Sequence, residues 1–139
     1  MFNESEARFL REMRVARLAT ADASGQPHVI PIVFAFDGQH LYTPIDEKPK
    51  RVAPLRLKRV RNLLENSQVA IVVDRYDRDW TQLAWVLVRG RGELVEEGET
   101  SRTGISLLKE KYAQYEQMPL EGRPLIVVTP SEVTSWGKL

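Results

Sequence analysis

The chain has 139 residues, 42% of them hydrophobic and 28% charged, which is typical of one globular domain with a real core and argues against disorder. Its 20 Lys and Arg residues nearly balance 19 Asp and Glu residues, and the net charge of +1 predicts no nucleic-acid partner. There is no cysteine, which excludes a disulfide framework, a thiolate metal site and a cysteine nucleophile.

The N-terminal part of the chain predicts a short helix followed by a β-meander. Asn3 or Ser5 can cap the helix, whose apolar residues recur on one face. From Val15 the hydrophobic period becomes that of a strand, and glycine-containing turn signals separate the apolar runs. The expected strands cover residues 15–21, 28–36 and 41–43, with turns at 22–25 and 37–38.

The remainder of the chain predicts two more helices and four more strands. Prolines at positions 44, 49 and 54 exclude regular structure from residues 44–54 and indicate a functional or crossing loop. Gly90 and Gly92 inside a long apolar run predict a bulge, or a bend at a barrel corner. The expected helices cover residues 55–66 and 99–116, and the expected strands cover 69–73, 83–95, 124–128 and 133–136, with a polar segment at 74–82 and a break at 129–130.

Seven strands and three helices predict a β-rich α+β fold that forms a single domain over residues 1–139. Sequential hairpins and the glycine-bent strand favour a barrel over an open sheet, because closure removes exposed edges. No apolar stretch approaches the ~20 residues of a membrane helix, and residues 1–14 hold no apolar run of signal-peptide length. We therefore expect a cytoplasmic protein without a membrane span.

Residues that commonly carry out catalysis or bind metals are scarce. His28 and His40 are the only histidines, and neither has a second histidine or a carboxylate at ligand spacing. No nucleophile-elbow motif occurs, and residues 89–92 lack both the third glycine and the following helix of a phosphate loop. We therefore expect no metal site, and no catalytic acid, base or nucleophile supplied by the protein.

Positive charge is clustered in one part of the chain. Seven basic residues and no acidic residue lie between Lys48 and Leu64, whereas the two signs are mixed elsewhere. The cluster covers the proline-rich loop and the first turns of a predicted helix, where unpaired N–H groups and the helix dipole attract anions. Cations there oppose the dipole, at a cost of about 0.3–1 kcal/mol each. This pattern favours an anion site over a solvated basic face, and the few aromatic residues nearby disfavour single-stranded nucleic acid.

Two further segments carry candidate binding residues. Pro31 within residues 29–33 has to lie at a sheet edge or at a point where no ladder donor is needed, and such a position leaves a flat apolar patch suited to a planar ring. Plain core with an edge proline explains the run equally well. Residues 74–85 combine acidic and aromatic side chains, as at an interface or a pocket rim. Within this segment we assign Trp85 to the core and Trp80 to a functional surface.

Together these segments resemble the pyridoxamine-phosphate-oxidase-like, FMN-binding split β-barrel superfamily, and within it the group of F420-dependent (deazaflavin-dependent) oxidoreductases. The resemblance covers nearly the whole chain. The opening landmark is common to the superfamily, whereas the last is the most specific to the group. The landmarks are Arg17-Leu18-Ala19-Thr20 with the following Asp22 to Pro27, then Pro31-Ile32-Val33-Phe34, then Arg59-Val60-Arg61-Asn62-Leu63, and finally Tyr76-Asp77-Arg78-Asp79-Trp80 with Val86-Leu87-Val88-Arg89-Gly90.

The resemblance implies a homodimer of split β-barrels with short flanking helices, and a cofactor in the groove between the two subunits. It implies that the cofactor ring lies against the second and third strands, at His28, Val29, Ile30, Pro31, Tyr42 and Thr43. It implies that the phosphate is held by Lys48, Lys50, Arg51, Lys58, Arg59, Arg61 and Asn62. It further implies that the second subunit closes the site through Trp80, Gln82 and Trp136.

The chemistry also follows from the resemblance. A flavin or deazaflavin carries out hydride transfer itself, and the protein contributes orientation, electrostatics and exclusion of water, which accounts for the missing catalytic residues. Seven local cations exceed what one FMN phosphate needs and favour F420, whose tail adds carboxylates. The implied function is hydride transfer between reduced F420 and a small organic substrate. The alternatives are an FMN-dependent reductase or oxidase of the same fold, and a non-enzymatic carrier or sensor that binds flavin or haem.

Overall fold

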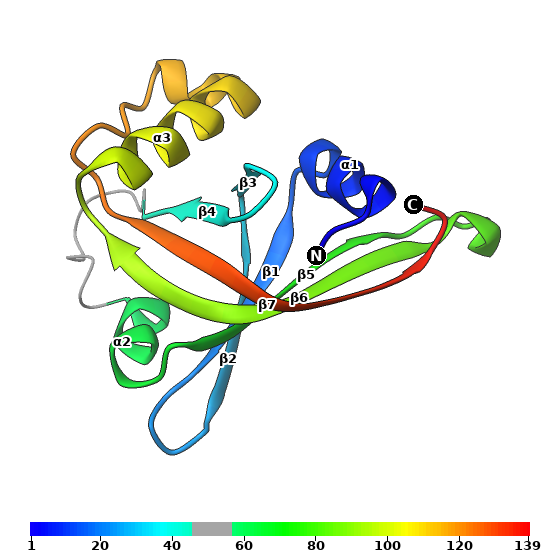
Figure 1. The fold of residues 1–139 in the computed structure, drawn as a ribbon, viewed down its shortest axis with the longest axis horizontal. Coiled ribbons are helices and arrows are strands. Elements are labelled where there is room, and N and C mark those ends of the chain that lie inside the picture. The colour runs from blue at the N-terminus through cyan, green and yellow to red at the C-terminus, as the bar shows by residue number, and fades with distance from the viewer. Residues whose placement is uncertain (46–56) are drawn as a thin grey trace.

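The computed structural model describes residues 1–45 and 57–139. Within these ranges seven strands form one antiparallel sheet in the order β2-β1-β5-β6-β7-β4-β3 (Figure 1). The strands are β1 (Ala16–Ala21), β2 (Pro27–Ile32), β3 (Ala35–Phe36), β4 (Leu41–Pro44), β5 (Gln68–Arg75), β6 (Ala84–Val95) and β7 (Leu125–Gly137). The helices are α1 (Glu4–Glu12), α2 (Lys58–Glu65) and α3 (Glu99–Lys111), with the short 3-10 helices η2 (Trp80–Gln82) and η3 (Ala113–Glu116).

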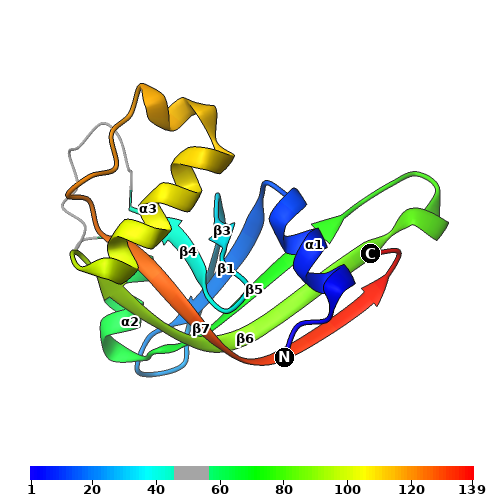
Figure 2. The ribbon, with the colours of Figure 1, turned by 45° about the horizontal axis from the view of Figure 1, so that its top comes forward.

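The sheet curls because its two edge strands are consecutive in the chain. β2 and β3 lie at opposite ends of the strand order, yet only Val33 and Phe34 separate them. In a flat sheet six spacings of about 4.8 Å would put the edges about 29 Å apart. Two connecting residues reach only about 10 Å, so the edges have to approach each other. Figures 1 and 2 show the resulting curl, which confirms the predicted β-rich α+β split barrel.

α1 begins where the sequence predicts. The Asn3 side chain accepts the backbone N–H of Glu6 at 2.8 Å, and the Glu6 carboxylate accepts the backbone N–H of Asn3 at 3.0 Å. This reciprocal pair is a capping box, which satisfies two of the N–H groups at the helix start. Phe9 and Leu10 form its buried face. No helix in the described parts of the chain is long and apolar enough to cross a membrane.

β6 and β7 are the longest strands, and they pair along their whole length (Figure 1). Their register shifts between Arg89 and Gly90, which confirms the predicted bulge. At this point a β-carbon on Gly90 would collide with the carbonyl oxygen of Thr129. Pro130, which has no N–H to donate, lies opposite Gly90 in the shifted register. The bulge therefore lets β7 run through the predicted break at 129–130 as one strand, so the prediction of two separate strands is wrong.

The predicted strand 28–36 is divided into β2 and β3, which pair with different neighbours. The backbone N–H of Phe34 donates to the Tyr112 hydroxyl at 3.1 Å, and that hydroxyl lies 3.0 Å from the Phe34 carbonyl oxygen. These bonds replace ladder partners and allow the chain to leave one edge for the other. Tyr112 also caps α3, because its N–H donates the last helical hydrogen bond to the Leu108 carbonyl. The predicted helix 99–116 is therefore divided into α3 and the short 3-10 helix η3.

Two apolar clusters hold the sheet and helices together. The larger lies inside the curl and includes Leu18, Phe34 and Val60, so that it anchors α1 and α2 to the sheet. The smaller cluster includes Tyr42 and Leu108, and it joins α3 and η3 to strands β3, β4 and β7. The predicted helix 55–66 is seen as α2 from Lys58 onward, and residues 55–56 lie outside the described residues.

Candidate functional site

A groove of about 410 Å³ lies where the edge strand β2, strand β4, helix α2 and η3 meet. It brings together predicted residues that are far apart in the sequence, namely Ile30, Pro31, Thr43 and Arg59. Tyr115 and Pro44 also line it, although neither was predicted as a site residue. Pro44 directly follows the predicted strand 41–43, whereas no local signal marks Tyr115, which reaches the groove only because η3 folds back over the sheet.

The end of strand β2 forms one side of the groove. The strand pairs only with β1, where Pro31 lies opposite Arg17, and this confirms that Pro31 occupies a sheet edge. Ile30 and Pro31 form an apolar wall of the groove at the end of the strand. Farther along β2, Val29 is 63% exposed and His28 is half-buried, and neither lines the groove.

Arg59 is the cationic residue of the groove wall. It lies in the first turn of α2 and is only 8% exposed. This turn contains no acidic residue, and the N-cap Leu57 makes no side-chain capping bond. The helix end therefore keeps its positive potential, and a guanidinium stands beside it in a largely apolar groove. Such an arrangement suits a phosphate or carboxylate, which the guanidinium can bind through two parallel N–H donors.

Asn62, one helical turn after Arg59, is fully buried and binds the protein itself. Its Nδ2 donates to the Thr20 hydroxyl at 3.0 Å, and Thr20 faces His28 across the β1–β2 pair. The Oδ1 of Asn62 and the Nδ1 of His28 are buried without a hydrogen-bond partner among the described residues. Thr20, which was not predicted, therefore ties α2 to the sheet and fixes the position of the helix that carries Arg59.

The other predicted basic residues are dispersed. The Lys58 Nζ lies 4.0 Å from Asp22, whose carboxyl pKa is lowered mainly by hydrogen bonds from Ser24 and Gln26. Arg61 is exposed, and two residues along a helix turn it about 200° away from Arg59. The remaining three predicted phosphate ligands lie outside the described residues: Lys48, Lys50 and Arg51.

Tyr42 and Thr43 are adjacent in β4 and point to opposite faces. Thr43 lines the groove, whereas Tyr42 is 2% exposed and packs in the core under α3. The Tyr42 hydroxyl donates to the Asp37 carboxylate at 2.7 Å. Burial and this hydrogen bond both raise the pKa of the tyrosine, so it stays protonated. Tyr42 thus holds the turn after β3 in place and does not line the groove.

The three residues predicted to close the site lie far from this chain's own groove. Trp80 and Gln82 belong to η2, and Trp136 lies near the end of β7, opposite Trp85 in the β6–β7 pair. Figures 1 and 2 show that η2 and this end of β7 are at the opposite end of the molecule from α2. Trp80 is 71% and Trp136 is 53% exposed.

Trp85, which was assigned to the core, instead lies half-buried on the outer face of the sheet. It lines a shallow groove of about 500 Å³ with Val72 and Leu87, whereas Val86 and Val88 on the same strand point into the core. The alternation along β6 explains the difference, since successive residues face opposite sides. The outer face therefore exposes an apolar strip.

A curled antiparallel sheet whose two edge strands are consecutive in the chain is a split barrel, and here a groove containing Arg59 lies at one of its edges. The sequence matches the family model "Pyridoxamine 5'-phosphate oxidase" over residues 2–137, so the chain belongs to that family.

Named relatives of the chain include reductases and a haem protein. The chain is 26% identical to a 5a,11a-dehydrotetracycline/5a,11a-dehydrooxytetracycline reductase of Streptomyces rimosus, over 98% of this chain and 83% of the relative. The solved structure of an F420 reductase superposes with a TM-score of 0.68 at 24% identity, covering 96% of this chain and 98% of the other. The haem storage protein HutZ of Vibrio cholerae superposes with a TM-score of 0.73 at 21% identity, covering 99% and 95%.

Proposed function

We propose that this protein is an oxidoreductase that binds F420 and transfers hydride between the reduced cofactor and a small organic substrate. The observation that carries the proposal is Arg59, a nearly buried arginine in the wall of a groove whose other walls are the apolar edge strand β2 and Thr43. The reductase from Streptomyces rimosus and the F420 reductase structure support the same class of function.

The groove residues fit the parts of such a cofactor. A guanidinium such as that of Arg59 is suited to bind a phosphate through two parallel donors, and the positive end of the α2 dipole adds to the attraction. Ile30 and Pro31 offer apolar surface for the ring system at the edge of the sheet, and Thr43 lines the same groove. When bound, the cofactor supplies hydride chemistry, which needs no acid, base or nucleophile from the chain. The chain's own residues bind it, orient it and shield it from water.

A second copy of the chain completes the site in this proposal. The groove is open to solvent, whereas small-molecule sites bury most of the ligand's surface, so a second wall is needed to cover the cofactor. The strip of Val72, Trp85 and Leu87 on the outer face is apolar and supports burial against another subunit. Trp80, Gln82 and Trp136, distant from this chain's groove, are then available to close the groove of the other subunit.

Cofactor titration tests the proposal. The purified protein is titrated with F420, FMN and haem, and binding is followed by cofactor fluorescence or absorbance. We expect F420 to bind and Arg59→Gln to weaken it at least tenfold, because hydrogen bonds to charged groups contribute about 1.5–3 kcal/mol. Arg102→Gln on the exposed face of α3 is the control and should leave affinity unchanged. Binding of FMN or haem without F420 would overturn the cofactor assignment.

A further inference from the structure

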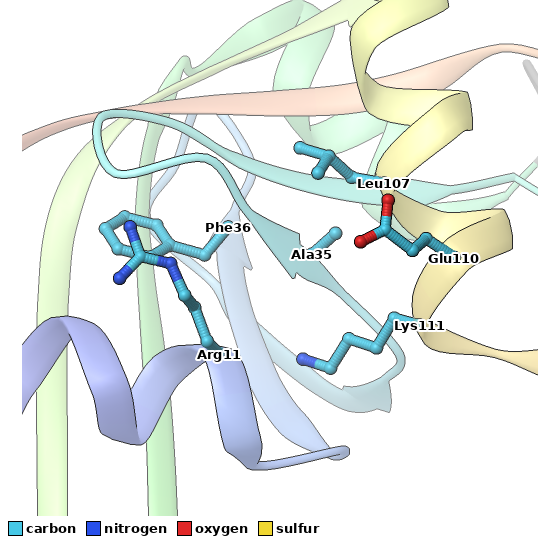
Figure 3. A pocket seen from close by; sticks show the side chains of 6 residues that line it. All are labelled: Arg11, Ala35, Phe36, Leu107, Glu110 and Lys111. Atoms are coloured by element: carbon cyan, nitrogen blue, oxygen red, sulfur yellow. The ribbon is translucent and has the colours of Figure 1, made fainter.

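We propose that the cavity between α1, β3 and α3 is a second binding site, which takes a small organic carboxylate with an apolar body. The cavity measures about 330 Å³ and is lined by residues of three elements (Figure 3). It is separate from the groove of Arg59, with which it shares no lining residue. The inference therefore goes beyond the proposed function and does not rest on it.

Three cations gather around this cavity. Arg11 and Lys111 line it, and Arg14 donates to the Lys111 carbonyl at 2.7 Å. Among the described residues no carboxylate lies within 4.0 Å of any of these three charges. Arg11 and Arg14 are exposed, so water solvates them, and Lys111 is the cation for which a missing partner matters. Lys111 is half-buried, and a cation removed from water without an anionic partner is costly.

The Lys111 ammonium contacts only uncharged groups of the protein, which leaves its charge available to an anionic ligand. Its Nζ lies 3.4 Å from the Leu10 carbonyl at the end of α1, and 3.9 Å from the centre of the Phe34 ring. A carbonyl and a ring face each attract an ammonium, but neither neutralises it. Burial and the nearby Arg14 charge accordingly lower the pKa of Lys111 to about 8.

The walls of the cavity define the rest of the ligand. Figure 3 shows Arg11 reaching in from α1 and Glu110 and Lys111 from α3, with Ala35 and Phe36 of β3 between them. The Arg11 guanidinium lies 5.5 Å from the centre of the Phe36 ring, so this cation is positioned over an apolar floor. A carboxylate between Arg11 and Lys111 would neutralise both charges, and its apolar part would lie along the apolar lining of the cavity, which is formed by Ala35, Phe36 and Leu107.

Glu110 sets a further requirement on the ligand. Its carboxylate faces the cavity from the α3 side (Figure 3) and repels a second negative charge. A dicarboxylate is therefore disfavoured, whereas a monocarboxylate with an apolar or hydrogen-bond-donating far end is accepted. Phenylacetate, 3-phenylpropionate and hexanoate have this chemistry and a size that suits the cavity.

Direct binding to the full chain tests the site without any cofactor. Each acid is titrated up to about 10 mM while the backbone amide signals of residues near Ala35 and Lys111 are followed by NMR. We expect saturable shifts at these residues for at least one acid, and much weaker binding of phenylacetamide, the uncharged counterpart of phenylacetate. Lys111→Met and Arg11→Gln should each weaken binding at least tenfold, which corresponds to about 1.4 kcal/mol.

Two matched variants keep the test specific. Lys109→Met removes a lysine of α3 that does not line the cavity and forms an ion pair with Glu121 at the surface. Arg8→Gln removes an arginine of α1 that does not line the cavity either. Both should bind the acids as the original chain does. The proposal is overturned if no acid shifts the cavity signals, if phenylacetamide binds equally well, or if Lys111→Met and Lys109→Met have the same effect. None of these outcomes bears on F420 binding.

Discussion

Replacing Thr20 by valine removes one buried hydrogen bond and tests how α2 is held. The Thr20 hydroxyl accepts from Asn62 at 3.0 Å, and the two residues are 3% and 0% exposed. Valine retains the shape of threonine but cannot accept a hydrogen bond, so the Asn62 amide would be left unsatisfied where water does not reach it.

The expected cost follows from this burial. A buried polar group that loses its partner costs about 1–3 kcal/mol, a sizeable part of the roughly 5–15 kcal/mol that stabilises a domain. For a chain of this length the melting temperature should fall by roughly 3–12 °C. The groove should be affected less, because Arg59 is carried on a helix that the Val60 and Leu63 side chains still anchor in the core.

Urea unfolding, followed by tryptophan fluorescence, measures the loss. Thr20→Ser is the control, because it keeps the hydroxyl and loses only a methyl group, at about 0.8 kcal/mol. Adding Asn62→Leu to Thr20→Val should recover part of the stability, since replacing both partners removes the unsatisfied group. Stability of the valine variant equal to that of the original chain would refute the reasoning, because the hydrogen bond would then contribute nothing.

Three other variants test separate features. Lys111→Met should be more stable than the original chain at neutral pH, because the lysine is charged in the folded state there and its burial is costly. The pKa of Lys111 is about 8 in the folded state and 10.5 in the unfolded state, so the advantage of the variant should shrink as the pH rises between these values, by less than about 1.4 kcal/mol per pH unit. Urea unfolding measured across this range would contradict the prediction if the difference in stability stayed constant. Gly90→Ala should cost roughly 1–3 kcal/mol and more than Gly92→Ala, because its β-carbon meets backbone of Thr129 rather than a movable side chain; comparable unfolding midpoints would contradict this. In the proposed dimer Trp136 closes the groove of the second subunit, so Trp136→Ser should weaken association of two chains in sedimentation analysis. Unchanged association would place Trp136 outside the proposed interface.

Features set by the backbone of a single residue could be predicted from the sequence. Pro31 requires a sheet edge or another position without a ladder donor, and the structure places it in the edge strand β2. Gly90 indicates a bulge or a bend, and the structure confirms the bulge. Asn3 likewise caps α1 through contacts within one turn. By contrast, the division of the strand 28–36 depends on Tyr112, which is 78 residues from Phe34, and no local pattern signals such a contact.

Part of the candidate site could be predicted from the sequence, and part could not. The charge cluster identified Arg59, and helical periodicity places Arg61 on another side of α2. Thr20 and Tyr115 could not be found, because each acquires its role only when distant strands and η3 come together. Tyr42 was misplaced relative to the groove because the face of a short strand depends on its register with β7.

In the function that we propose, Arg59 holds the phosphate of F420 in the groove beside β2. A crystal structure of the protein grown with F420 tests it most directly. We predict that the phosphate contacts the Arg59 guanidinium, that the ring lies against Ile30 and Pro31, and that a second chain covers the groove. F420 bound away from Arg59, or FMN found in place of added F420, would contradict the account.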